Sequence, residues 1–242
     1  MQGLATISRE RPVLIAGPTA AGKSALALAL AARDGRMVVN ADALQCHDTW
    51  RVLTARPSPE EEAAAPHALY GHLRRGAPAS VGHWLRSVAP LLAGPRPVVI
   101  VGGTGLYLSA LTEGLAEIPP IPPDVRAEAD ARMAAEGAPA LLAEIDLATA
   151  VRIDTANPAR IQRAWEVLRA TGQGLAVWQA APPAPLLPRA GIEALVISPP
   201  RDVLAARIDA RFAAMVAGGA LDEVRAALPF WDPTAPWARA IG

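Results

Sequence analysis

The chain has 242 residues, 52% of them hydrophobic, and its 23 basic residues balance 23 acidic ones. This length suits one α/β domain with an insertion or two small domains, and net neutrality gives no general sign of a nucleic-acid partner. No apolar run reaches 18 residues, the first twelve residues lack the apolar core of a secretory signal, and Cys46 is the only cysteine, so we expect a cytoplasmic protein without membrane spans or internal disulfides.

The charge is unevenly distributed. No acidic residue occurs between Glu62 and Glu113, although this segment carries four arginines and three of the four histidines. Such a stretch suits a phosphate-rich partner, and an ordinary solvated loop and helix explains it equally well. The cationic residues concerned are Arg74, Arg75, Arg86, Arg96, His67, His72 and His83.

The first half of the chain predicts alternating strands and helices. Short apolar runs that end in glycine or a carboxylate predict buried strands at 13–17, 37–42 and 97–105. Segments without helix breakers predict helices at 22–32, 81–92 and 106–115. This alternation predicts an α/β fold with a doubly wound parallel sheet.

Two proline-rich breaks divide the second half. The run "EIPPIPP" (117–123) precedes expected helices at 124–136, 138–146 and 157–171, the last beginning with an Asn cap and Pro158. After "APPAPLLP" (181–188), a strand at 192–198 and helices at 203–216 and 221–228 are expected. We therefore predict a sheet domain in residues 1–116, a helical insertion in 117–188 and a return to the sheet domain in 189–242.

The strand at 13–17 and the helix at 22–32 enclose a phosphate-binding motif. The sequence "GPTAAGKS" fits G-x-x-x-x-G-K-[ST], in which backbone N–H groups surround an anion at a helix N-terminus. Its lysine is the only lysine of the chain, because the other 22 basic residues are arginine. The predicted phosphate-binding residues are Gly17, Pro18, Thr19, Ala20, Ala21, Gly22, Lys23 and Ser24, and the Ser24 hydroxyl is the expected Mg²⁺ ligand.

One carboxylate stands out near this P-loop. The third strand ends in Gly102-Gly103-Thr104-Gly105 without the Mg²⁺-binding aspartate typical of P-loop NTPases, and the strand-end acid is instead Asp42. Asp42 could be a metal ligand, a general base or a turn-capping residue. The pattern indicates group transfer to an acceptor, which leaves two classes: an ATP-dependent small-molecule kinase, and a transferase whose large substrate uses the helical insertion.

Taken together, these motifs resemble the tRNA dimethylallyltransferases, also called isopentenyltransferases, from residue 12 to residue 242. Only the P-loop is specific by itself; the order and spacing of all motifs make the resemblance specific. The further motifs are "ADALQ" (41–45), "TARPS" (54–58), "VGGTGLY" (101–107), "PPDVRAE" (122–128), "NPARIQRAWEV" (157–167), "RIDARFAAMVAGG" (207–219) and "RAIG" (239–242).

The resemblance implies that the P-loop holds the diphosphate of dimethylallyl diphosphate. The prenyl group would pass to the exocyclic amine of the adenosine 3′-adjacent to the anticodon, with Mg²⁺ as cofactor and the anticodon stem-loop as partner. Asp42 would take the proton, Thr104 would lie near the reacting groups, and Arg211 would stabilise the diphosphate with Lys23. The implied tRNA-binding residues are Ala41, Asp42, Ala43, Leu44, Gln45, Thr104, Arg126, Arg160, Ile161, Gln162, Arg163 and Ala164.

Several positions depart from the family pattern. Ala43 replaces a serine, His47 an aromatic residue, Ala68 a histidine and His83 an acid, and these changes affect expected tRNA contacts more than the chemistry. The chain is expected to be C-terminally short and monomeric. Ordinary structural roles are also considered: Arg163 could pair with Glu166, Arg211 could be a surface residue, and Trp84, Trp165 and Trp178 are expected in cores or interfaces.

Overall fold

A computed structural model of the chain describes residues 6–77 and 79–240 and divides it into two compact units. The first, which we call the sheet unit, combines the parts before Glu113 and after Pro185, and the second, the helical unit, is Glu113–Pro185. The predicted insertion, 117–188, differs from the helical unit by a few residues at each end. Both boundaries lie next to irregular segments, where no periodic pattern fixes a limit.

The sheet unit is built on a parallel sheet with the strand order β3-β2-β4-β1-β5. This sheet confirms the predicted fold class. The strand β3 was not predicted, because its two residues are too few to show a strand pattern. The strands are β1 (Val13–Ala16), β2 (Met37–Asn40), β3 (His67–Ala68), β4 (Val98–Gly102) and β5 (Glu193–Val196).

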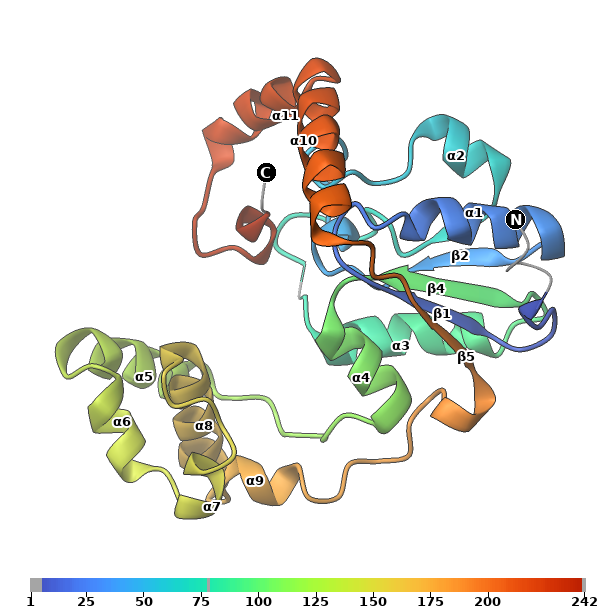
Figure 1. Cartoon of the computed structure of the whole chain (residues 1–242). Helices are drawn as coiled ribbons and strands as arrows, with labels where there is room; N and C mark the ends of the chain where they lie inside the picture. Colours follow the sequence, from blue (N-terminus) through green and yellow to red (C-terminus); the bar gives the residue numbers. More distant parts are fainter. Residues whose placement is uncertain (1–5, 78, 241–242) are drawn as a thin grey trace. The chain divides into compact units, whose positions relative to one another are not determined.

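Helices cover both faces of this sheet, as a doubly wound fold requires (Figure 1). Successive strand residues point to opposite faces, so Val13 and Ile15 pack with α1 (Lys23–Asp34), whereas Leu14 packs with α3 (Val81–Leu92) and α4 (Gly105–Glu113). On both faces of the sheet, the central strands β1, β2 and β4 contribute hydrophobic side chains to the core. This explains why those strands appear in the sequence as continuous hydrophobic runs.

The helical unit has a core of its own. Its helices are α5 (Pro123–Ala135), α6 (Ala138–Glu144), α7 (Leu147–Ala150), α8 (Pro158–Thr171) and α9 (Leu175–Trp178). Asp146 caps α7 through the N–H of Thr149, so the helix predicted over 138–146 ends before this residue. Trp165 is buried in this core and Trp178 packs against it, as predicted.

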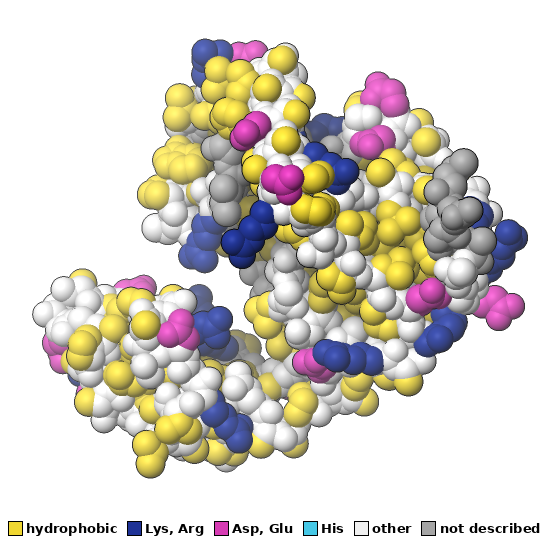
Figure 2. Space-filling view, in the orientation of Figure 1, with side chains coloured by type: hydrophobic (Ala, Val, Ile, Leu, Met, Phe, Trp, Pro, Cys, Tyr) yellow, Lys and Arg dark blue, Asp and Glu magenta, His cyan; other side chains and the backbone are white. Residues whose placement is uncertain are grey.

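The last part of the sheet unit consists of α10 (Arg201–Ala217), α11 (Ala220–Ala227) and two short 3-10 helices, η4 (Leu228–Phe230) and η5 (Pro236–Arg239). No residue of α10 is buried, and hydrophobic side chains gather on the surface over α10 and α11 (Figure 2). Beyond them, Trp50 and Trp237 form a small buried cluster with Ala227. Within the described residues, no helix combines the length and hydrophobicity that a membrane span needs.

Candidate active site

The phosphate-binding loop lies where β1 ends and α1 begins. Gly22 is the N-cap residue of α1 and has φ 99°, a left-handed conformation that favours glycine. No side chain caps this helix end, so its first N–H groups remain available to an anion. The predicted strand–loop–helix arrangement is therefore present.

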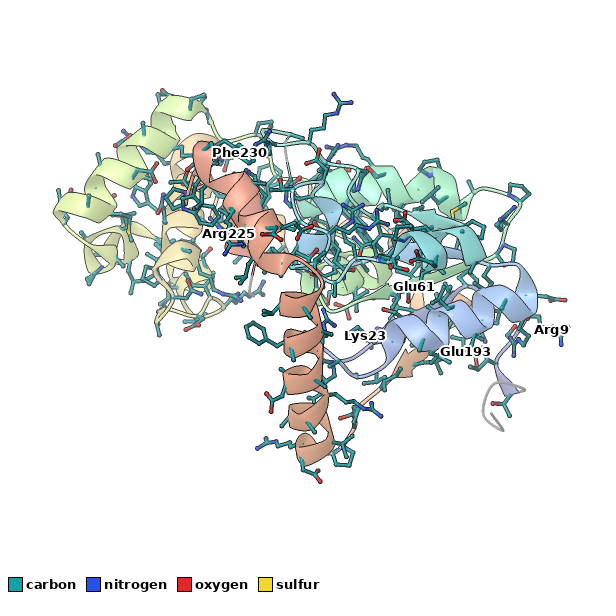
Figure 3. All side chains as sticks on the ribbon, turned by 90° about the horizontal axis from the view of Figure 1, so that it is seen from above. Arg9, Lys23, Glu61, Glu193, Arg225 and Phe230 are labelled. Carbon is teal, nitrogen blue, oxygen red and sulfur yellow. The ribbon has the colours of Figure 1, made fainter. Side chains whose placement is uncertain are left out.

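Lys23 is the first residue of α1, and its ammonium group folds back over the loop (Figure 3). Its Nζ donates hydrogen bonds to the carbonyl oxygens of Gly17 and Pro18, both at 2.8 Å. Burial lowers the pKa of Lys23, the nearby charge of Asp42 raises it, and the charge of Arg211 lowers it. The lone lysine thus lies within electrostatic range of both residues predicted to share its site.

Asp42 follows β2 in a turn that fixes its position. Its Oδ1 accepts the N–H of Leu44 at 3.0 Å, and its backbone N–H donates to Oδ1 of the buried Asn40 at 2.9 Å. The Asn40 amide in turn donates to the carbonyls of Asp42 and Leu69. Within the part of the chain that the structure describes, no hydrogen bond is formed by Oδ2, which leaves this oxygen available to a substrate proton.

The glycine-rich end of β4 separates Asp42 from the phosphate-binding loop. A Cβ atom at Gly103 would lie 4.0 Å from Oδ2 of Asp42 and 3.9 Å from the Gly17 carbonyl oxygen, so a side chain here would fill the space between them. Thr104 is held at the same point, because its Oγ1 accepts the N–H of Ala43 at 2.9 Å. Gly102, the last residue of β4, has no room for a side chain, because a Cβ atom there would clash with the Ala41 carbonyl oxygen.

Arg211 reaches this site from α10. Its pKa is lowered by burial and raised by the charge of Asp42, so the side chain is partly withdrawn from solvent near that carboxylate. One turn earlier, Arg207 Nη1 donates to the carbonyl oxygen of Ala21 at 3.4 Å, which ties α10 to the loop. Arg211 and Ser24 also line a cavity of about 260 Å³, together with Arg56, His67 and Tyr70 among others.

The site fits a magnesium ion only if a substrate supplies part of the ligand shell. Among the described residues, no three His, Cys, Asp or Glu side chains cluster closely enough to hold a metal. Ser24 lies exposed at the start of α1, and Mg²⁺ in such sites uses few protein oxygens together with phosphate oxygens and waters. The hydroxyl of Ser24 beside a bound diphosphate matches this preference.

The predicted RNA-contacting residues of the sheet unit have different surroundings. Ala41 is fully buried, so its side chain cannot touch RNA, and its carbonyl oxygen accepts the N–H of Thr104. The Gln45 amide donates to the carbonyls of Thr54 and Ala55 at 2.8 and 3.0 Å, which fixes the loop that follows. Ala43 and Leu44 are partly exposed next to Asp42.

In the helical unit, the structure separates the predicted RNA-contacting residues into two groups. Ile161 and Ala164 lie in the core of the unit, so the expectation that they contact RNA directly is wrong for their side chains. Gln162 donates to Asp130, and Arg163 lies 3.7 Å from Glu166, the pair expected from their spacing. Arg126 and Arg160 are exposed, and neither forms an ion pair with any residue that the structure describes.

Sequence reasoning missed the residues that hold the site in place. Asn40 holds the Asp42 turn, and Trp84 Nε1 donates to the Asn40 carbonyl at 2.8 Å from α3. Arg56 and Tyr70 line the cavity beside Ser24. An amide side chain at the end of an apolar strand is the only sequence signal for Asn40. Arg56 lies in the motif "TARPS" and Trp84 was expected in a core or interface, but neither was assigned to the site, and no local pattern indicates Tyr70.

The chain is similar over nearly its whole length to known proteins. The family model described as IPP transferase matches residues 45–242, and the model described as isopentenyl transferase matches residues 11–68. The tRNA dimethylallyltransferase of Dinoroseobacter shibae is 62% identical over 241 residues, which covers 99% of this chain and 81% of that protein. The enzyme of the same name from Cereibacter sphaeroides strain KD131 is 65% identical over 240 residues, covering 99% and 76%.

Solved structures show the same fold. The full-length tRNA isopentenylpyrophosphate transferase of Bacillus halodurans superposes with a TM-score of 0.62 at 29% identity, covering 96% of this chain and 75% of that one. A eukaryotic dimethylallyltransferase acting on tRNA gives a TM-score of 0.77 at 20% identity, covering 95% and 60%. The second likeness is informative about the fold alone.

Proposed function

The chain belongs to the IPP transferase family, and from this premise we propose that it is a tRNA dimethylallyltransferase. It transfers the dimethylallyl group from dimethylallyl diphosphate to the exocyclic amine of the adenosine 3′-adjacent to the anticodon and releases diphosphate. The observation that carries this proposal is the geometry at the phosphate-binding loop. The Lys23 Nζ donates to the Gly17 and Pro18 carbonyls. A Cβ atom at Gly103 would contact both Gly17 and Asp42, and Arg211 lines the cavity beside Ser24. Two cations and one carboxylate suit a reaction in which an anion leaves and a proton is removed.

The reaction follows from the placement of these groups. The diphosphate lies in the loop, where Lys23 and Arg211 stabilise the negative charge that develops as the allylic C–O bond breaks and its electron pair leaves with the diphosphate. The adenine amine supplies the electron pair for the new N–C bond. Asp42 Oδ2, which has no hydrogen-bond partner among the described residues, accepts the proton that the amine loses.

Two further groups support this step. Thr104, held by the Ala43 N–H, lies beside Asp42 and positions the acceptor. Ser24 would hold Mg²⁺ together with diphosphate oxygens, and a bound Mg²⁺ adds positive charge against the leaving group. Gly103 lies between the carboxylate and the loop, where a Cβ atom would contact both.

The RNA partner in this proposal is the anticodon stem-loop. Enzymes that modify a base take it out of the stack, and specific RNA recognition uses loop nucleotides whose bases are free. Arg126 and Arg160 of the helical unit are exposed and have no ion-pair partner among the described residues, which suits contacts with phosphates. We further propose that the protein acts as a monomer in the cytoplasm.

The small-molecule kinase is not favoured. The curated relatives that cover nearly the whole chain carry the name of the tRNA enzyme, and β4 lacks the carboxylate that holds Mg²⁺ in P-loop NTPases.

The test is a transfer assay with labelled dimethylallyl diphosphate and bulk tRNA, run in parallel with ATP and a metabolite mixture. We expect label in tRNA, and a loss of about 10²–10⁴-fold in rate for Asp42→Asn. Asp48→Asn is the matched control, because Asp48 is an exposed carboxylate in the same segment and keeps its backbone bond to Leu73. ATP consumption without labelled tRNA would reject the proposal.

A further inference from the structure

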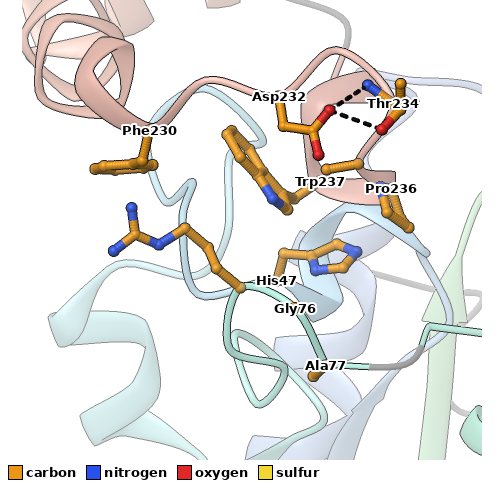
Figure 4. A pocket seen from close by; sticks show the side chains of 10 residues that line it. His47, Gly76, Ala77, Phe230, Asp232, Thr234, Pro236 and Trp237 are labelled. Atoms are coloured by element: carbon orange, nitrogen blue, oxygen red, sulfur yellow. Dashed lines mark hydrogen bonds between the residues drawn. The ribbon is translucent and has the colours of Figure 1, made fainter.

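A second pocket of the sheet unit lies outside the candidate active site (Figure 4). Its volume is about 560 Å³, and its lining includes His47, Arg75, Phe230, Thr234 and Trp237. None of its lining residues also lines the cavity beside Ser24. The mechanism proposed above therefore leaves this pocket unused.

The pocket contains a buried polar group without a partner. His47 is only 3% exposed, and its Nδ1 forms no hydrogen bond within the described residues. Burial lowers the pKa of His47, so the imidazole is neutral and can either donate or accept a hydrogen bond. An unsatisfied buried nitrogen is costly, and a ligand with a hydrogen-bonding edge would remove this cost.

Three of the other nine lining residues carry flat π groups: Arg75, Phe230 and Trp237. The guanidinium carbon of Arg75 lies 3.3 Å from the centre of the Phe230 ring, and the Phe230 and Trp237 rings are 6.0 Å apart. Aromatic rings and guanidinium planes are the surfaces on which proteins stack unpaired nucleobases. The pocket thus combines stacking surfaces with one buried hydrogen-bonding atom.

The charge of the pocket also suits RNA. Arg75 is exposed and belongs to the segment without acidic residues, and it forms no ion pair with the residues described. Asp232 is the one carboxylate among the lining residues, and its Oδ1 accepts hydrogen bonds from the Thr234 N–H and hydroxyl at 2.9 and 2.7 Å. Among the described residues, no carboxylate therefore competes with a phosphate for Arg75, whose guanidinium lies over the Phe230 ring.

A short segment connects the pocket to the catalytic carboxylate. Asp42 accepts the N–H of Leu44, which begins the 3-10 helix η2 (Leu44–Cys46), and the Leu44 carbonyl accepts the N–H of His47 at 3.4 Å. The two side chains thus stand at the two ends of one hydrogen-bonded turn. A nucleotide in the pocket and a base at Asp42 would be held by the same rigid segment.

We propose that this pocket binds the base of a second unpaired nucleotide of the RNA substrate, with His47 at its edge and Arg75 near its phosphate. The inference rests on the proposed function, because the partner is the loop that carries the target adenosine. It explains a departure in the sequence: His47 stands where the family has an aromatic residue, and histidine keeps the ring while adding a hydrogen-bonding nitrogen.

The test uses RNA hairpins with the anticodon stem and loop, in which each loop nucleotide except the target adenosine is made abasic in turn. With the wild-type chain, we expect one abasic position to lower affinity about tenfold, the scale of one stacked base. In His47→Phe and in Arg75→Ala, the intact hairpin should bind more weakly and that abasic position should cause no additional loss. Arg86→Ala, an exposed arginine on α3 outside the pocket, should keep the wild-type pattern.

The outcomes separate the two proposals. One outcome is that the wild-type protein modifies the intact hairpin, but the loss of affinity from the abasic position simply adds to the loss from the side-chain substitution. In that case the pocket inference is wrong and the transferase proposal stands. If the losses are coupled but no prenyl group is transferred, the pocket binds RNA and the transferase proposal fails. Displacement of the hairpin by free adenosine monophosphate without such coupling would make this a mononucleotide site and overturn the inference. Arg75 is exposed, so its variant tests the pocket even if His47→Phe unfolds.

Discussion

The sheet unit and the helical unit hold their charged residues in opposite ways. In the sheet unit, Lys23 and Arg211 are partly withdrawn from water, the charge of Asp42 raises the pKa of both, and Arg36 is fully buried against Asp34. In the helical unit, Glu166 is buried, whereas the arginines lie nearer the surface. There Arg132 contacts Glu136 and Glu144 at 2.8 Å, Arg169 pairs with Glu128, and Arg126 and Arg160 have no ion-pair partner among the described residues.

This difference indicates what each unit contributes. A partly buried charge has already lost much of its hydration, so it interacts strongly with a ligand charge and its removal is costly. An exposed charge is screened by salt, and each one adds only a small increment to affinity or stability. We therefore expect chemistry and stability to depend on single residues of the sheet unit, and RNA affinity to be spread over many residues of the helical unit.

The largest effect is expected at Lys23. Lys23→Ala should lower the transfer rate on the order of a thousandfold or more, because it removes a preorganised charge at the leaving group. Lys23→Arg should not restore the rate, since a planar guanidinium cannot replace an ammonium that donates to the Gly17 and Pro18 carbonyls. Single-turnover transfer is the measurement, with Arg225→Ala on α11 as the exposed control (Figure 3). Equal losses of transfer rate in Arg225→Ala and Lys23→Ala would contradict the contrast between partly buried and exposed cations.

The next largest effect concerns stability. The pKa of Asp34 is lowered to about 2 by the Arg33 and Arg36 guanidinium groups, and the pKa of the exposed Glu144 is lowered to about 2 by Arg132 and Trp165. Asp34→Asn leaves Arg36 buried without its ion partner and should lower the free energy of unfolding by about 3–4 kcal/mol. Glu144→Gln should lower the free energy of unfolding by a smaller amount.

Acid and salt distinguish these two carboxylates. Since the folded pKa of Asp34 lies below its ordinary value of 3.8, its contribution is present above about pH 4 and is lost as the pH falls toward 2. In urea titrations, 1 M salt should remove the effect of Glu144→Gln but keep most of the effect of Asp34→Asn. Equal salt sensitivity would show that Asp34 is not shielded from solvent.

The smallest effect is expected for the unpaired arginines of the helical unit. Arg160→Ala or Arg126→Ala should weaken hairpin binding by less than about tenfold and reduce the salt slope of binding by about one counterion. Arg169→Ala is the matched control, because Glu128 already faces that charge at 3.4 Å. Binding measured over a range of salt concentrations decides the question, and unchanged slopes for all three variants would remove the helical unit from the RNA surface.

Much of the fold follows from local patterns in the sequence. The apolar runs of β1, β2 and β4 and the Asn157–Pro158 start of α8 are set by neighbouring residues, and the structure has these elements where they were predicted. The strand β3 could not be predicted, because its two residues are recognised only through pairing with β2. Similarly, the helical pattern of α8 does not say which face is buried, so Ile161 was assigned to RNA although it packs in the core.

The sequence by itself determined the phosphate-binding loop, because the glycines, the lone lysine and the following helix act within a few residues of one another. Only the tertiary structure decided which distant groups share its site. Strand β4 inserts between β1 and β2 and brings the Gly103 gap beside Asp42, and α10 returns Arg211 to the first loop of the chain. The pocket that joins His47 to Phe230 has the same origin: contacts between residues far apart in sequence depend on how the sheet and helices pack, which no local pattern encodes.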